Sequence, residues 1–225
     1  MMRNNKSANT NSRSSMLHKN ILFSGVLKAI GLITSLVIVP ITINYLNDEV
    51  YGVWMTITSV LYWITTFDIG LGNGMRNYLT EALSKGDTAL GRSYLSTTLI
   101  LLSLIALTMG AALIYPLYSI NFNSFFNTYA VSGADLRLAV IIAVAFTLMN
   151  FVLKNIGFIF VALQRYALND LLAISGNVIS LIIIYLLTKV TSGSLVLVVL
   201  AYTLTSCVVY LLAAIPLFWK HPELK

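Results

Sequence analysis

Charged residues are scarce in this chain. They make up 10% of its 225 residues, while 58% of the residues are hydrophobic and the mean hydropathy is +0.84. A soluble domain carries about 25% charged residues. The composition therefore excludes an ordinary soluble domain and indicates a helical protein whose solvent is the lipid bilayer.

Cysteine and histidine are nearly missing as well. Cys207 is the one cysteine, so no disulfide can form within the chain and no metal-ligand spacing exists. The two histidines, His18 and His221, stand near opposite ends of the chain. We find no carboxylate pair, no Ser-His-Asp set and no Cys-His set, and we expect no enzyme, no metal site and no cofactor. Coupling to a proton or a sodium gradient is left open.

The basic residues predict a topology rather than a nucleic-acid partner. The net charge is +6, but the charges do not cluster on one segment. With a cytoplasmic N-terminus, ten of the fourteen Lys and Arg residues fall on the cytoplasmic side and two, Arg137 and Lys189, fall outside. This asymmetry follows the positive-inside rule. Both termini are therefore expected in the cytoplasm.

The expected fold is an all-α integral membrane protein with six transmembrane helices in one bundle, N-in and C-in. Residues 1–19 are polar and predict a disordered cytoplasmic tail. The bundle occupies 20–220, and 221–225 form a cytoplasmic end. Each apolar segment is long enough to cross a ~30 Å hydrocarbon core. The predicted helices are 21–46, 50–69, 93–118, 138–163, 171–188 and 195–219, with an amphipathic cytoplasmic helix at 75–85.

A glycine-rich run, FDIGLGNGMRN at 67–77, follows the second segment. Its glycines miss the spacing of both the dinucleotide fingerprint and the P-loop. The stretch before them, 50–67, is uncharged and too long for a buried strand. A nucleotide site is therefore not expected. We expect a hinge or gate at the cytoplasmic mouth, formed by Asp68, Gly70, Gly72, Asn73, Gly74 and Arg76.

The residues of this hinge suggest different roles. Each glycine costs a helix about 1 kcal/mol relative to Ala, and Asn73 tolerates a left-handed conformation. Arg76 is expected at headgroup depth, where it can meet lipid phosphate. Asp68 either pairs with Arg76 or another base, or caps a local turn. The sequence leaves these alternatives open. It also does not decide whether the run is a plain hinge or a gate or headgroup site.

Two lysines lie within apolar segments. Lys28 and Lys154 are each eight or nine residues from the predicted inner end of a segment, ~12–14 Å deep. Charges at this depth are costly and usually functional. With no acid expected at the same depth, we predict a cationic substrate cavity that favours an anionic head group. Asn150 and Asn177 lie on polar stripes and complete the predicted cavity, although stripes of small polar residues also serve helix packing.

One stretch resembles a known family. The run YGVWMTITSVLYWITTFDIGLGNGMRNYLTEALSKGD at 51–87 is similar to the signature region of the Wzx-type polysaccharide and O-antigen flippases, and the closing PLFWKHPELK resembles the segment after their sixth helix. These flippases belong to the multidrug/oligosaccharidyl-lipid/polysaccharide exporter superfamily. The resemblance implies two six-helix bundles facing a central cavity. It also implies flipping of an undecaprenyl-pyrophosphate-linked oligosaccharide across the bacterial inner membrane, for O-antigen (lipopolysaccharide) or capsule.

The chain departs from that pattern in length, since it supplies one bundle where the resemblance implies two. We therefore expect an N-terminal lobe, inactive alone unless it meets a second six-helix lobe or polysaccharide assembly proteins. The expected partners are the lipid-linked oligosaccharide and the bilayer, with no nucleic acid. A drug/cation antiporter of the same superfamily and a non-transporting scaffold of the glycan assembly complex remain as alternatives.

Overall fold

Helices make up the regular structure of this protein. The computed structural model describes the backbone of residues 4–68 and 70–224, and side chains from Phe23 onward except at 69. No β-strand occurs in these described ranges. The elements are α1 (Asn4–Leu46), α2 (Asp48–Thr66), α3 (Leu71–Ser84), α4 (Thr88–Ser119), α5 (Phe122–Phe126), α6 (Gly133–Leu153), α7 (Asn155–Ala162), α8 (Tyr166–Val190), α9 (Leu195–Lys220) and the 3-10 turn η1 (Pro222–Leu224).

Five stretches of the described chain are long and apolar enough to cross a membrane. They are Phe23–Leu46 of α1, helix α4, the stretch Gly133–Ala162 that contains α6 and α7, and helices α8 and α9. Helices α2 and α3 pass the same test only as a pair, bent by 43°. The protein is thus a helical, multi-pass membrane protein with five spans, or six if the bent pair is one span.

The first helix is longer than the sequence predicts. Helix α1 begins at Asn4, so residues 4–19, which we predicted as a disordered tail, have a helical backbone; Met1–Arg3 lie outside the described residues. The polar stretch contains no glycine and no proline. It also continues an apolar helix, so each added residue extends an existing nucleus and avoids the cost of starting a new helix.

Capping side chains explain several helix starts that hydropathy misses. Helix α4 begins at Thr88 rather than at 93 because the Asp87 carboxylate accepts a hydrogen bond from Leu90 N at 2.9 Å. Ser132 caps α6 in the same way, and this helix begins five residues before the predicted 138. The short α5, which we did not predict, is capped by Asn121 and ends at the left-handed Asn127.

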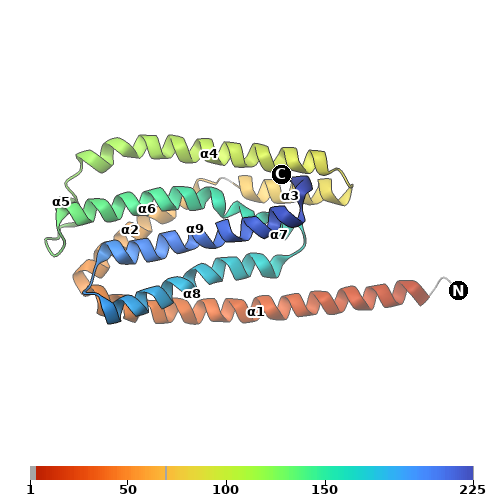
Figure 1. Ribbon diagram of the computed structural model, residues 1–225, viewed down its shortest axis with the longest axis horizontal. Coiled ribbons are helices and arrows are strands. Elements are labelled where there is room, and N and C mark those ends of the chain that lie inside the picture. Colours follow the sequence, from red (N-terminus) through yellow and green to blue (C-terminus); the bar gives the residue numbers. More distant parts are fainter. Residues whose placement is uncertain (1–3, 69, 225) are drawn as a thin grey trace.

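The connections between helices gather at two ends of the bundle (Figure 1). One, called the α5 end, holds Asn47, α5 and the α8–α9 connection. The other, called the α3 end, holds α3, α7, the start of α1 and η1. Helix α1 packs mainly on α8, and α6 packs on α9. This arrangement leaves room for a cavity between α1–α8 and α2–α6–α9.

Two apolar clusters hold the helices together. The larger cluster joins α2, α6 and α9 and includes Trp54, Leu136 and Val198. The smaller cluster joins α3, α4, α7 and α9 at the α3 end and includes Leu79 and Ile159. Large apolar side chains also cover the outside of the bundle, where lipid would solvate them. Because lipid tails are as apolar as these side chains, close packing rather than expulsion of water must stabilise the bundle.

Candidate functional site

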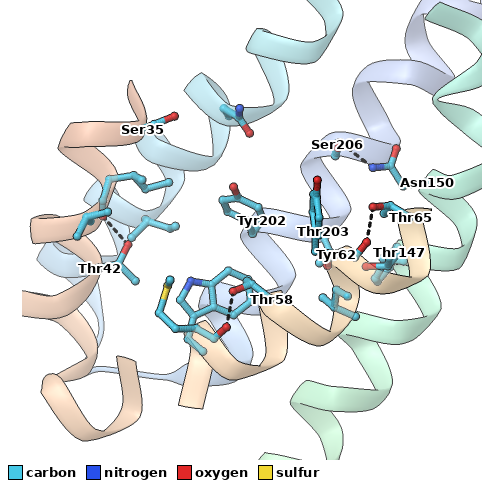
Figure 2. Close-up of a pocket in the computed structure, with 18 of the residues that line it drawn as sticks. Ser35, Thr42, Thr58, Tyr62, Thr65, Thr147, Asn150, Tyr202, Thr203 and Ser206 are labelled. Carbon is cyan, nitrogen blue, oxygen red and sulfur yellow. Dashed lines mark hydrogen bonds between the residues drawn. The ribbon is translucent and has the colours of Figure 1, made fainter. Parts of the chain in front are cut away.

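A cavity of about 470 Å³ lies between five helices of the bundle. Side chains from α1, α2, α6, α8 and α9 line it, and Figure 2 shows them converging on one space. Four of them are aromatic residues with polar groups, from α2 and α9: Tyr51, Trp54, Tyr62 and Tyr202. Hydroxyl and amide side chains form most of the rest, and no lining residue carries a charge. The cavity is therefore neutral.

Half of the ten hydroxyl groups that line this cavity already use their hydrogen-bond donor within the protein. Five of them donate to a backbone carbonyl three or four positions earlier in their own helix, at 2.7 to 2.9 Å, and their lone pairs remain free. Because the donor is used inside the helix, each oxygen can offer a ligand little except acceptance. These side chains are Ser35, Thr42, Thr58, Thr65 and Thr203.

Asn150 adds another acceptor. Its amide nitrogen donates to Ser206 Oγ at 3.1 Å, as Figure 2 shows, and its Oδ1 is buried without a hydrogen-bond partner. A buried unpaired polar atom costs about 1–3 kcal/mol, and a ligand donor at this position would remove that cost. Asn177 also lines the cavity, from α8. The structure thus brings together two of the four predicted cavity residues.

The two predicted lysines do not line this cavity. Lys28 is exposed on α1, seven positions before Ser35 and so about 10 Å along the helix axis. Lys154 is partly buried, and its Nζ lies 3.6 Å from Asp68 Oδ2. The prediction that no acid would neutralise these cations is therefore wrong for Lys154. This cavity therefore lacks the cationic lining that we predicted for the substrate site.

Lys154 stands at a break in its span. Helix α6 ends at Leu153 and α7 begins at Asn155, with Lys154 as the junction. The Lys154 ammonium also donates to Thr65 O, in the last turn of α2, at 3.3 Å. It further lies 5.3 Å from the centre of the Phe151 ring. One cation thus contacts a backbone carbonyl at the C-terminal end of α2, where the helix dipole favours positive charge.

Asp68 has two roles, which answers the question that the sequence left open. Its Oδ2 pairs with Lys154, and its Oδ1 accepts a hydrogen bond from Gly72 N at 3.1 Å. Gly72 is the second residue of α3, so the carboxylate caps the start of this helix. Arg76 is partly exposed and donates instead to Asn77 Oδ1. The acid therefore joins the α2–α3 break to the α6–α7 break.

The three glycines of the hinge differ in what surrounds them. Gly70 has φ +79°, the left-handed conformation that we had considered for Asn73, whereas Asn73 lies inside α3. Gly72 packs tightly against α7, and a Cβ there would lie 2.6 Å from Phe158 and against Asn155 Oδ1. Gly74 faces open space. Close packing of α3 on α7 therefore requires glycine at position 72 and not at position 74.

The cavity, the ion pair and the tight glycine share one region. Thr65 lines the cavity and gives its carbonyl to Lys154, and Asn150 lies one helical turn before Lys154. Asn155, which follows Lys154, is fully buried and donates to Phe151 O and Val152 O. Sequence reasoning missed Asn155, although a polar residue beside an intramembrane lysine was a usable signal.

Comparison with known proteins gives one informative result. A Salmonella typhimurium protein named "Putative O-antigen transporter" is 33% identical over 73 residues, which are 32% of this chain and 16% of that protein. The match therefore spans about a sixth of the relative's length. No family model matches the chain, and no solved structure matches it. The similarity supports a loose relation to a polysaccharide transporter, which is named as a transporter and not as an enzyme.

The substitutions Gly72→Ala and Gly74→Ala form a matched pair. We expect Gly72→Ala to destabilise the protein by about 1–3 kcal/mol, because the new methyl group overlaps Phe158 and Asn155. Gly74→Ala should be neutral or stabilising by up to ~1 kcal/mol, because alanine is the better helix former and has space. Thermal unfolding in a mild detergent measures both. Equal effects would contradict the close contact of α3 with α7.

A double-mutant cycle tests the Lys154–Asp68 pair. Lys154→Met should destabilise the protein, because Asp68 then stays partly buried without its cation. Asp68→Asn removes that charge and retains an oxygen that can cap Gly72 N. The double variant should therefore be more stable than Lys154→Met alone, with a coupling of about 0.5–3 kcal/mol in chemical or thermal unfolding. Strictly additive effects would show that the two charges do not interact.

Proposed function

We propose that this bundle belongs to a transporter that flips a lipid-linked oligosaccharide, an undecaprenyl-pyrophosphate derivative, from the inner to the outer leaflet of the bacterial cytoplasmic membrane. The product would serve O-antigen or capsule assembly. In this proposal the α3 end faces the cytoplasm, because most basic residues that flank the spans belong to segments at this end. The relative with the O-antigen transporter name supports the same class of cargo.

The neutral, acceptor-rich cavity carries the proposal. Sugars present many hydroxyl donors, and the cavity offers them free oxygen lone pairs on α1, α2, α6 and α9, with the buried Asn150 Oδ1 among them. The rings of Tyr51, Trp54, Tyr62 and Tyr202 provide flat surfaces on which the C–H faces of a sugar can pack. Both features suit an oligosaccharide better than a charged molecule.

The same chemistry argues that the pyrophosphate does not occupy this cavity. A pyrophosphate that links a lipid to a sugar is an anion, and no lining residue of this cavity carries a positive charge that would compensate it. We propose that the sugars enter the cavity while the pyrophosphate stays near the basic residues of the α3 end. Arg76 is partly exposed and Arg92 is exposed, both in segments of this end.

Alternating access requires one bundle to rock against another. We therefore propose that the working transporter pairs this bundle with a second six-helix lobe, within one polypeptide or between two. A drug/cation antiporter is less well supported, because such a protein would favour acids in its cavity and the lining here has none. A scaffold without transport remains an outcome that the following experiment can identify.

The test uses a bacterial strain that lacks its own O-antigen flippase. We expect the chain to restore surface O-antigen when it is expressed with a candidate second lobe and not when it is expressed alone. We also expect the purified chain to retain lipid-linked oligosaccharide in native mass spectrometry. Substitution of Asn150 and Asn177 by alanine should reduce the retained oligosaccharide about tenfold, because two hydrogen bonds of ~0.5–1.5 kcal/mol are lost.

Thr108→Ala is the matched control. Thr108 is an exposed threonine of α4, and its hydroxyl donates to Ile105 O in its own helix, outside the cavity. This variant should retain oligosaccharide as the unchanged protein does. Retention without rescue would support a lobe that needs its partner. Neither retention nor rescue would overturn the proposed cargo, and association with assembly proteins would then indicate the scaffold.

A further inference from the structure

We propose that a second cavity, at the α5 end, binds a phosphate group through Arg137. This cavity has a volume of about 420 Å³ and shares no lining residue with the neutral cavity. The segment Ser119–Asn123, from the last residue of α4 into the start of α5, forms one wall. The first turns of α6, with Gly133, Ala134 and Arg137, form the other. The inference does not depend on the oligosaccharide function proposed above.

Arg137 is the one charged residue in the lining, and its guanidinium lacks protein partners. Its Nε is buried and has no hydrogen-bond partner. Among the residues that the structure describes, no carboxylate forms an ion pair with it. A guanidinium has five donors in a planar fork that matches the oxygens of a phosphate. An unpaired buried donor is costly, so a ligand that accepts from Nε would stabilise this arrangement.

The acids closest to this cavity in the fold are occupied elsewhere. Asp135 Oδ2 accepts from the Ser132 hydroxyl at 2.8 Å. Glu49, at the start of α2, accepts from the Thr128 hydroxyl. Both carboxylates therefore serve to fix the loops around α5 and leave Arg137 free. The field inside the cavity is that of an uncompensated cation, which attracts an anion.

Other groups in the lining add donors and favour an anion over a neutral ligand. Asn121 accepts a hydrogen bond from Ser124 N through its Oδ1. Its amide nitrogen is a separate group that can donate to a ligand. Ser119 is exposed in the lining and contributes a hydroxyl. Asn123 is different, because its nitrogen donates to Thr128 O and Val131 O and its Oδ1 lies against Gly133. This lining thus combines a cation with neutral donors, whereas the neutral cavity has no charged group.

A phosphate could reach this cavity from solution or on a lipid headgroup. The experiment uses the purified full chain in a maltoside detergent, which contains no phosphate, and follows thermal unfolding by tryptophan fluorescence. One arm adds inorganic pyrophosphate, with sodium chloride at equal ionic strength as its control. The other arm adds phosphatidylglycerol to the micelles, with diacylglycerol as its control. Binding to the folded state should raise the midpoint temperature in a saturable manner, by a few degrees.

Arg137→Gln should abolish this rise. Lys189→Gln is the matched control, because Lys189 is an exposed cation at the same end that lies 5.5 Å from the Tyr185 ring and outside the cavity. This control should keep the full response. Ser119→Ala, a milder change in the lining, should weaken the apparent affinity about tenfold, as expected for one hydrogen bond to a charged group. It tests the site even if Arg137→Gln does not fold.

The two arms identify the source of the phosphate. A response to both probes supports a site for phosphate from either source, and a response to phosphatidylglycerol alone supports a lipid headgroup. A response that persists unchanged in Arg137→Gln, or in Ser119→Ala where the first variant does not fold, overturns the proposal. So does the absence of a response to either probe in the unchanged protein.

Discussion

The contact between Lys154 and Asp68 is the interaction on which the middle of this bundle depends. Two spans are interrupted at this point, α2–α3 and α6–α7, and an interruption in a membrane leaves backbone groups without helical partners. The two charges supply those partners as well as neutralising each other. Lys154 donates to Thr65 O at the end of α2, and Asp68 accepts from Gly72 N at the start of α3. The ion pair therefore holds the α2–α3 break against the α6–α7 junction.

This use of charge explains why the neighbouring cavity is neutral. The lysine that would have made it cationic points to an acid and a carbonyl at the edge, and the cavity keeps only hydroxyls, amides and aromatic rings. The hydroxyls in turn donate to their own helices, as hydroxyl groups in apolar surroundings do. The hydroxyls that donate within their own helices can offer a ligand only acceptance, while the aromatic polar groups of the lining can also donate.

The sequence predicts the helical membrane class well, because apolar runs of this length with few charged residues are typical of helices whose solvent is lipid. It predicts the positions of Asn150 and Asn177 in a cavity because polar residues at helical spacing avoid lipid. It could not predict the partner of Lys154, since Asp68 lies between α2 and α3, and the packing of α2 on α6 and of α3 on α7 brings the two residues together. Nor does hydropathy indicate α5 or the start of α4, which depend on single capping side chains.

The distribution of charge along the bundle suggests how a mixed cargo would be handled under the proposed function. A lipid-linked oligosaccharide carries neutral sugars and an anionic pyrophosphate, so no single environment suits it. The neutral cavity would solvate the sugars, while cations occur at the α3 end and, through Arg137, at the α5 end. The pyrophosphate would then be stabilised most at the two ends of its path and least in the middle of the bundle. Such an arrangement favours passage over tight retention, because binding that is strongest at the midpoint of the path would slow release.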